Sequence, residues 1–256
     1  MKPLRAAWMA ILVPVLCAQT VSVHDLVATA RQRIQQADAR IVGHLIWAPA
    51  TGARISYPLT IRAHWFPGVL RIRVDIGQPP SEKVDKREHI LLEMRPDGDD
   101  TIRVANPGDK APRIVPFEKW NANPLTPGFS YEDFLEDQSF WPGQTSEGMA
   151  KYGARNCMII KSTPGPGEHT QYSAAKSWID PTIAFPVYVE KTVKETGAVK
   201  EETSFGIRHD EGVWSASQIQ VQVRGQAGST FLTVDRGSAK ANLTADDFSA
   251  AQLIKF

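Results

Sequence analysis

Cysteine is scarce in this sequence, which holds only Cys17 and Cys157. Two thiols are too few for a disulfide framework, and they do not stand at the spacing of a zinc site. If a leader is removed after Ala18, the mature chain keeps Cys157 alone, and an intrachain disulfide is then excluded. We therefore expect the fold to depend on the burial of apolar side chains.

A surplus of charge is also missing, since the formal net charge of the 256 residues is +1. A protein whose main partner is nucleic acid needs basic residues to neutralise phosphates, so we expect no nucleic-acid partner. With 42% hydrophobic and 22% charged residues, the composition is that of a soluble globular protein. The length suffices for one large β domain with a substantial core.

Catalytic signatures are absent as well, because the six histidines are scattered and no nucleophile elbow or phosphate loop occurs. His89 and Glu93 are four positions apart, which on a strand separates them by about 13 Å at ~3.3 Å per residue, too far to share a metal. The segment from His209 to Glu211 is expected at a solvated turn, and Cys157 lies in an apolar strand, where a thiol is usually inert. We expect no enzyme, no catalytic residue, no metal and no cofactor.

Long hydrophobic runs are confined to the amino terminus, where Lys2 and Arg5 precede the apolar run Ala6–Leu16. The small residue Ala18 then favours cleavage, so residues 1–18 are predicted to be a signal peptide. A retained anchor helix is less favoured, because the run is shorter than the roughly 20 apolar residues of a membrane span. Lipid modification of Cys17 is a third hypothesis, but the bulky Leu16 before it is atypical of a lipoprotein signal.

The stretch Phe129–Trp141, which we call the lid, lies between two blocks of strand-like sequence and is predicted to be a short amphipathic helix. Ser130 and Asp133 have the spacing of a capping box, and Pro142 ends the helix. The lid places apolar side chains on one stripe, namely Tyr131, Phe134 and Leu135. It places its acidic side chains largely off that stripe, namely Glu132, Glu136 and Asp137. Two alternatives stay open, a permanent seal over the sheet and a removable cover.

Two further helices are predicted from the same capping spacing. Ser22 and Asp25 begin a helix over residues 22–39, whose thin apolar stripe indicates a surface position. Thr244 and Asp247 begin a last short helix near the carboxyl terminus.

The rest of the chain alternates between apolar and polar residues with a period of two, as strands with one wet face do. Residues 57–66 and 70–76 form a predicted hairpin around Pro67-Gly68, and a second hairpin turns at 96–98. Residues 106–127 are predicted to be a long loop that carries Trp120. In the second half the predicted strands are 155–162, 170–180, 184–192, 202–209, 213–224 and 229–236. Their even spacing favours consecutive antiparallel hairpins.

The order of these segments resembles that of the periplasmic outer-membrane lipoprotein-sorting family, the LolA-like proteins. The resemblance rests on FSYEDF, KYGARNCMII, QYSAAKSWID, FPVYVEKT, and STFLTVDR followed by NLTADDF, which span roughly the second half of the chain. The first half agrees in pattern alone. The resemblance implies a mainly β protein with a few short helices, namely an incomplete, half-open antiparallel β-barrel with helices covering the concave face. Two departures are the greater length of this chain and the lack of a position for the family's lid-locking arginine.

What the resemblance implies about function is a carrier that binds lipoprotein acyl chains or lipid in a hydrophobic cavity, for transfer toward the outer membrane. The expected protein is a periplasmic monomer of one domain, residues 19–256, with a membrane transporter or an outer-membrane acceptor as further partners. The cavity residues predicted from the alternating strands are Leu59, Ile61, Trp65, Leu70, Ile72, Val74, Leu92, Ile219, Val221 and Val223. The predicted lid residues are Tyr131, Phe134 and Leu135.

The alternative hypothesis is an exported, non-enzymatic binding or scaffold protein. It would recognise a polysaccharide or a protein through exposed tryptophans, among them Trp120, Trp141, Trp178 and Trp214. An enlarged internal cavity favours the carrier, whereas a filled interior with stacked surface aromatics favours the alternative. Alternation alone does not separate the two, because a strand has one apolar face whether it encloses a ligand or its own side chains.

Overall fold

A computed structural model describes residues 22–81, 83, 85–96, 100–122 and 126–256. The predicted signal peptide, Cys17 and most of the predicted turn at 96–98 lie outside these residues, so they stay predictions.

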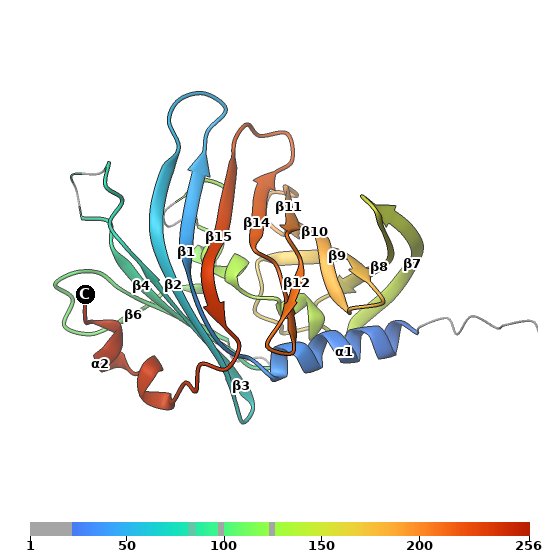
Figure 1. The fold of residues 1–256 in the computed structure, drawn as a ribbon, viewed down its shortest axis with the longest axis horizontal. Helices are drawn as coiled ribbons and strands as arrows, with labels where there is room; N and C mark the ends of the chain where they lie inside the picture. The colour runs from blue at the N-terminus through green and yellow to red at the C-terminus, as the bar shows by residue number, and fades with distance from the viewer. Residues whose placement is uncertain (1–21, 82, 84, 97–99, 123–125) are drawn as a thin grey trace, which may run out of the picture.

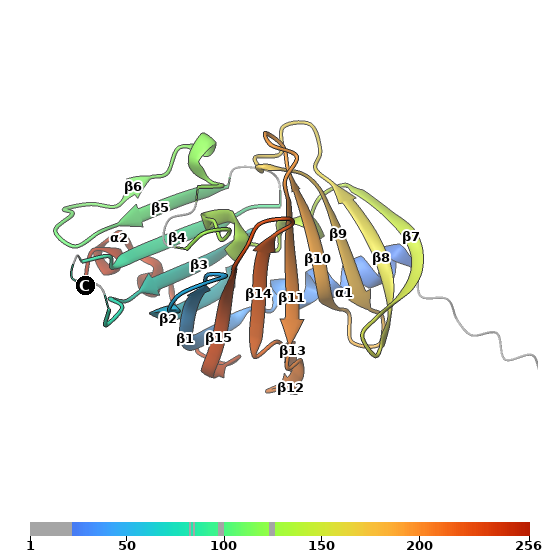
Figure 2. The ribbon, with the colours of Figure 1, turned by 90° about the horizontal axis from the view of Figure 1, so that it is seen from above.

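In the described part of the chain, thirteen strands form one antiparallel sheet (Figures 1 and 2). Its order is β6-β5-β4-β3-β2-β1-β15-β14-β11-β10-β9-β8-β7, while β12 and β13 form a separate pair. The strands are β1 Asp38–Ala48, β2 Ile55–Phe66, β3 Val69–Ile76, β4 Glu88–Met94, β5 Thr101–Ala105, β6 Arg113–Ile114, β7 Gly143–Tyr152, β8 Arg155–Thr163, β9 Tyr172–Asp180, β10 Phe185–Val193, β11 Val199–Phe205, β12 Arg208–Asp210, β13 Val213–Ser215, β14 Gln218–Val223 and β15 Ser229–Ser238.

The sheet is two meanders joined at its centre, where the first strand pairs with the last. One meander runs from β1 outward to β6, and the other runs from β15 outward to β7. The sheet curves but the edge strands β6 and β7 do not pair with each other, so the barrel is half open (Figure 2). The predicted fold class is confirmed.

The strands β1 and β15 approach closely at Gly43. A Cβ at this position would lie 1.8 Å from the carbonyl oxygen of Thr233, so only glycine fits without a shift of the backbone. The sequence prediction did not include β1, because it extended the preceding helix to Ala39. It also omitted β7, and it joined β13 and β14 into one strand.

The alternation of side chains gives the sheet two faces. We call the face that carries Ile61, Ile72 and Val221 the inner face, and the opposite one the outer face. The main core lies on the inner face beneath the lid. The helix α1, Val23–Gln35, packs Leu26 and Val27 against Ile160 and Ile179 of β8 and β9. Its Ser22 cap is as predicted, since the Ser22 hydroxyl accepts a hydrogen bond from the Asp25 amide.

The prediction of one continuous helix in the lid is wrong. The lid contains two short 3₁₀ helices, η2 Tyr131–Phe134 and η3 Asp137–Ser139, separated by the extended residue Leu135. The capping box of Ser130 and Asp133 is present. The helix breaks because the Leu135 carbonyl accepts a hydrogen bond from Nζ of Lys191 at 3.3 Å instead of from its own chain.

At the carboxyl terminus, η4 Ala245–Phe248 and α2 Ala250–Leu253 follow the predicted Thr244 capping box. Phe248 and Leu253 pack against Leu91 and Ala105. These two residues point outward from β4 and β5, so the terminal helices cover the outer face, whereas the prediction placed the helices on the concave face. The predicted loop at 106–127 contains β6 and a 3₁₀ turn, η1 Phe117–Lys119.

Candidate ligand cavity

Two adjoining cavities lie at the inner face, the larger between the sheet and the lid, and the smaller between the sheet, the end of α1, β13 and the lid. The larger has a volume of about 290 Å³ and the smaller about 210 Å³. Residues that line both are Arg33, Ala63, Ile72, Phe134 and Glu136. Since small-molecule sites in proteins run from about 300 to 1,000 Å³, the pair together offers a site of ordinary size.

Several predicted cavity residues do line these spaces. The larger cavity is bounded by Ile61, Ile72, Ile219 and Val221 from the sheet and by Phe134 and Leu135 from the lid. The smaller cavity is bounded by Leu70, Ile72 and Phe134. Ligand binding by these residues stays a prediction.

Other predicted residues lie elsewhere. Leu59, Val74 and Leu92 are buried in the core and line neither cavity. Trp65 stacks on Phe140 of the lid with ring centroids 5.8 Å apart. Val223 also lines neither cavity, and lies beside Gly128. Tyr131 of the lid is buried and its hydroxyl donates a hydrogen bond to the Glu88 carboxylate at 3.1 Å.

A buried charged cluster forms the other side of the site, and sequence reasoning missed it. Nζ of Lys200 on β11 lies 2.8 Å from a carboxylate oxygen of Asp133 and 2.8 Å from the Ser130 hydroxyl. Nζ of Lys191 on β10 lies 2.8 Å from a carboxylate oxygen of Glu202. The Tyr172 hydroxyl donates to Asp133. Asp133 and Glu202 also line the larger cavity, which therefore has one apolar wall and one ionic wall.

The charges of this cluster are fixed by its pairs. Burial alone would raise the pKa of Asp133, but Lys200 and Lys191 outweigh it and hold that pKa below its usual range. Burial would lower the pKa of Lys191, but Glu202 and Asp133 outweigh it and raise that pKa. Asp133 and Lys191 are therefore ionised at neutral pH, whereas burial raises the pKa of Glu202.

Two other lid carboxyls, which the sequence predicts to lie off the apolar stripe, are also buried. Burial is the main cause that raises the pKa of Glu132 to about 8 and the pKa of Asp137 to about 6. Glu132 accepts hydrogen bonds from the Thr170 hydroxyl and from the Gln171 amide. A carboxyl held in this way anchors the lid to the segment before β9.

The lid also contacts α1 through arginines. Arg33 forms a salt bridge with Glu136, and Nε of Arg31 donates a hydrogen bond to the Ser139 carbonyl at 2.6 Å. The carboxyl side chain of Glu136 is 41% exposed, whereas that of Asp133 is 0% exposed. The Asp133 side chain is thus fixed in the interior, whereas the Glu136 side chain reaches the surface, although Asp137 and Gln138 beside it are buried.

The tryptophans do not form the exposed surface that the alternative hypothesis required. Trp120 is 4% exposed and its indole donates a hydrogen bond to the Val115 carbonyl, and Trp141 is 1% exposed and packs against Tyr172. Trp178 and Trp214 are half-buried. The prediction is therefore wrong for two of the four residues.

Within the described residues, no group of three or more His, Cys, Asp or Glu side chains could hold a metal ion. In the same part of the chain, no helix has the length and apolar character needed to cross a membrane. Cys157 is buried, and burial raises the pKa of its thiol.

Three solved structures are similar to this one in fold. A DUF1329 family protein of Desulfovibrio piger has a TM-score of 0.76 at 17% identity, over 90% of this chain and 97% of that one. A domain described as an outer membrane lipoprotein-sorting protein domain, from Vibrio parahaemolyticus, has a TM-score of 0.76 at 16% identity, over 91% and 100%. A LolA superfamily protein of Nitrosomonas europaea has a TM-score of 0.68 at 14% identity, over 91% and 100%.

These likenesses establish the LolA-like open barrel as the fold of this chain. No curated protein sequence matches the chain. A family model described as "Uncharacterized protein" matches residues 82–255, more than half of the chain. The chain therefore belongs to this family of uncharacterized proteins.

Proposed function

We propose that this protein is a periplasmic carrier that binds acyl chains of lipoproteins or lipids in the two adjoining cavities and transfers them toward the outer membrane. The observation that carries the proposal is the pair of cavities itself, which adjoin the apolar inner face of the sheet and the lid. The fold shared with a lipoprotein-sorting domain supports it.

The lining favours an amphipathic guest. Ile61, Ile72 and Ile219 offer apolar surface, and each methylene buried there contributes about 0.8 kcal/mol. Arg33 and Glu136 lie at the margin of both cavities, where a polar end of the guest would meet them. The mechanism is non-covalent and requires no cofactor.

Lipid extraction and native mass spectrometry of protein from an export-competent host test the proposal first. We expect co-purifying lipid, and displacement of a bound fluorescent fatty acid by added lipid. A protein with neither property is not a carrier of acyl chains.

Variants locate the site. Ala63 lines both cavities, so Ala63→Trp is expected to fill them and abolish fatty-acid binding without placing a charge in the core. Thr145→Trp on exposed β7 is the matched control and is expected to bind normally. Ile72→Glu and Val221→Glu are expected to abolish binding as well. Retained binding in folded Ala63→Trp protein contradicts the proposed site.

One observation favours the alternative, a binding protein. A groove of about 600 Å³ on the outer face is lined by aromatic and polar side chains, namely Tyr152, Trp178, Tyr188, Glu201, Thr203, Phe205, Gln220 and Gln222. Tyr152 and Tyr188 stack with ring centroids 4.7 Å apart. If a saccharide binds there, it will change tryptophan fluorescence, and Trp178→Ala will remove the change.

A further inference from the structure

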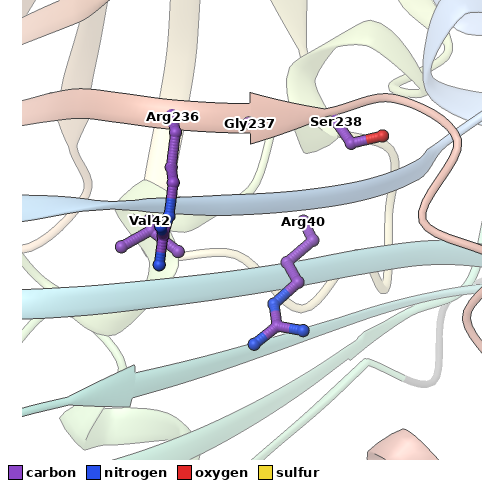
Figure 3. A pocket seen from close by; sticks show the side chains of 5 residues that line it. All are labelled: Arg40, Val42, Arg236, Gly237 and Ser238. Atoms are coloured by element: carbon purple, nitrogen blue, oxygen red, sulfur yellow. The ribbon is translucent and has the colours of Figure 1, made fainter.

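Two arginines share a hollow on the outer face, at the centre of the sheet. The hollow has a volume of about 360 Å³ and is lined by Arg40, Val42, Arg236, Gly237 and Ser238. Figure 3 shows both arginine side chains extending in the same direction, Arg236 from β15 across β1, and Arg40 from β1. Both residues are exposed.

The register of the strands explains why these side chains lie together. Arg236 is opposite Val42 and Ser238 is opposite Arg40, so all four belong to one face. The register shifts next to Val42, because Val234 and not Asp235 is opposite Gly43. This bulge places Asp235 and Arg236 on the outer face one after the other, and the Asp235 carboxylate lies 3.1 Å from Nδ1 of His44.

Arg40 also begins a row of like charges. It is directly opposite Arg62 of β2, and Arg62 is directly opposite Arg73 of β3. Like charges directly opposite each other destabilise a sheet unless an anion lies between them. Asp75 forms salt bridges with both Arg62 and Arg73, which neutralises that part of the row.

The remaining part of the row has no such counter-ion. Over the described ranges, no carboxylate forms a salt bridge with Arg40 or Arg236. Three nearby carboxylates have other partners: Asp38 lies 3.1 Å from His64, Asp235 lies 3.1 Å from His44, and Glu211 accepts hydrogen bonds from Ser238 and the Ala239 amide. The two guanidinium groups at the hollow therefore form no ion pair with the part of the chain that the structure describes, and they can bind an external anion.

We propose that this face docks on the surface of an anionic phospholipid bilayer, with the Arg40 and Arg236 guanidinium groups bound to headgroup phosphates. Guanidinium forms bidentate hydrogen bonds with phosphate oxygens. Of the five residues that line the hollow, only Arg40 and Arg236 are charged, so the part of a lipid that these side chains would bind is the anionic headgroup.

This docking is independent of the proposed acyl cavity, because Arg40 and Arg236 alternate with the inward residues and lie on the opposite face of the sheet. If the protein binds anionic vesicles but no fatty acid, the proposed function is overturned and this inference stands. If it binds fatty acid but no anionic vesicles, this inference is overturned and the proposed function stands.

The experiment is co-sedimentation with vesicles of phosphatidylcholine, with and without phosphatidylglycerol. We expect binding only to the anionic vesicles, and weaker binding as salt is raised. Each arginine near an anionic surface strengthens binding roughly fivefold, so Arg40→Gln with Arg236→Gln is expected to weaken it about thirtyfold. The control, Lys151→Gln with Lys194→Gln, removes the same charge from exposed positions at the other end of the sheet and is expected to bind nearly as the parent does.

Three outcomes overturn the inference. Equal loss in the arginine and lysine variants would show that net charge alone is responsible. Equal binding to neutral vesicles would exclude headgroup recognition. Inorganic phosphate or glycerol phosphate bound with Arg40 and Arg236, without binding to vesicles, would assign the hollow to a soluble anion. Unchanged melting temperatures confirm that the variants are folded, as expected for exposed side chains.

Discussion

The two halves of the inner face differ sharply in chemistry although they belong to one sheet. In the first meander the inward side chains of β2 to β4 are mostly apolar, as Ile61, Ile72 and Leu92 illustrate. Glu88, which accepts a hydrogen bond from Tyr131 of the lid, is an exception. In the second meander the inward positions of β10 and β11 include Lys191, Lys200 and Glu202. One meander therefore offers surface to a guest, whereas the other binds the lid by charge.

For the part of the lid around Ser130 and Asp133, this difference distinguishes a permanent seal from a removable cover. Removing Asp133 from Lys200 would leave two buried charges unpaired, and separating such a pair costs several kcal/mol. The contacts around Ser130 and Asp133 therefore favour a fixed cover. The Arg33–Glu136 pair is half-exposed and lines both cavities, so the movable side of the lid is expected there.

The largest expected effect comes from breaking the ionic wall. Lys200→Met leaves the Asp133 carboxylate buried without its cation, and we expect a loss of about 3–5 kcal/mol in the free energy of unfolding, measured by urea titration. The double variant Lys200→Met with Asp133→Leu is expected to recover a large part of the loss, since it removes both charges. If the single variant is as stable as the parent, the pair does not anchor the lid.

A smaller effect is expected from joining the two cavities. Phe134 lines both cavities and is half-buried. Replacing a fully buried phenylalanine by alanine costs about 3–5 kcal/mol of stability, so Phe134→Ala is expected to cost less. The joined cavity should shift binding toward longer fluorescent fatty acids.

The control for this variant is Phe140→Ala, which removes a lid phenylalanine that lines neither cavity. It is expected to leave the chain-length preference unchanged. The same shift in both variants would mean that the lid as a whole, and not the wall between the cavities, sets the preference.

The sequence predicts the two walls unequally. Ile72 and Val221 alternate with charged or amide neighbours, which predicts an inward position in a sheet with one wet face, and both lie on the inner face. In β10 the inward residues alternate along the strand, and Lys191 follows Val189 at the next inward position. A lysine at a position where an apolar residue is expected is a local signal of the ionic wall. Its meaning depends on partners that are distant in sequence, because Lys200 and Asp133 are 67 positions apart.

The lid shows the limit of local pattern most clearly. Its capping box is a local feature and was predicted, but its helical period was overridden. The burial of Glu132 and Asp137 and the hydrogen bond from Lys191 to the Leu135 carbonyl are tertiary contacts, and they fix a broken 3₁₀ conformation.

A pH dependence is expected from the carboxyl of Glu132. Its pKa is about 8 in the folded protein and about 4.3 in an unfolded chain, so the folded state binds more protons between these values. Its contribution to stability is therefore present below about pH 4 and is lost as the pH rises through 8. The melting temperature of Glu132→Gln should fall less than that of the parent between about pH 5 and pH 8.

The comparison between variant and parent removes the effect of titrating groups that do not interact with Glu132, such as His89, whose pKa is lowered mainly by burial. It includes the effect of Asp137, whose charge raises the pKa of Glu132. Asp133 has a lowered pKa, so its contribution to stability is lost as the pH falls, which is the opposite direction. That loss occurs in acid, below the range from about pH 5 to pH 8. Glu118→Gln, at an exposed position, is the control and should follow the parent curve. Parallel curves for Glu132→Gln and the parent would show that Glu132 is ionised in the folded protein.

The smallest effect on stability is expected at the movable side of the lid. The side chains of Arg33 and Glu136 are 20% and 41% exposed, so Arg33→Gln should cost no more than about 1 kcal/mol. The Arg33–Glu136 pair contacts only the second part of the lid, so hydrogen exchange is expected to accelerate at residues 136–140. Exchange at residues 131–135 is expected to stay unchanged, because Lys200 and Lys191 hold that part. Arg208→Gln, which removes an exposed pair with Asp210, should change neither segment. Acceleration along the whole lid would mean that the lid opens as one unit. The lid would then have no fixed part beside the ionic wall and no separate movable part.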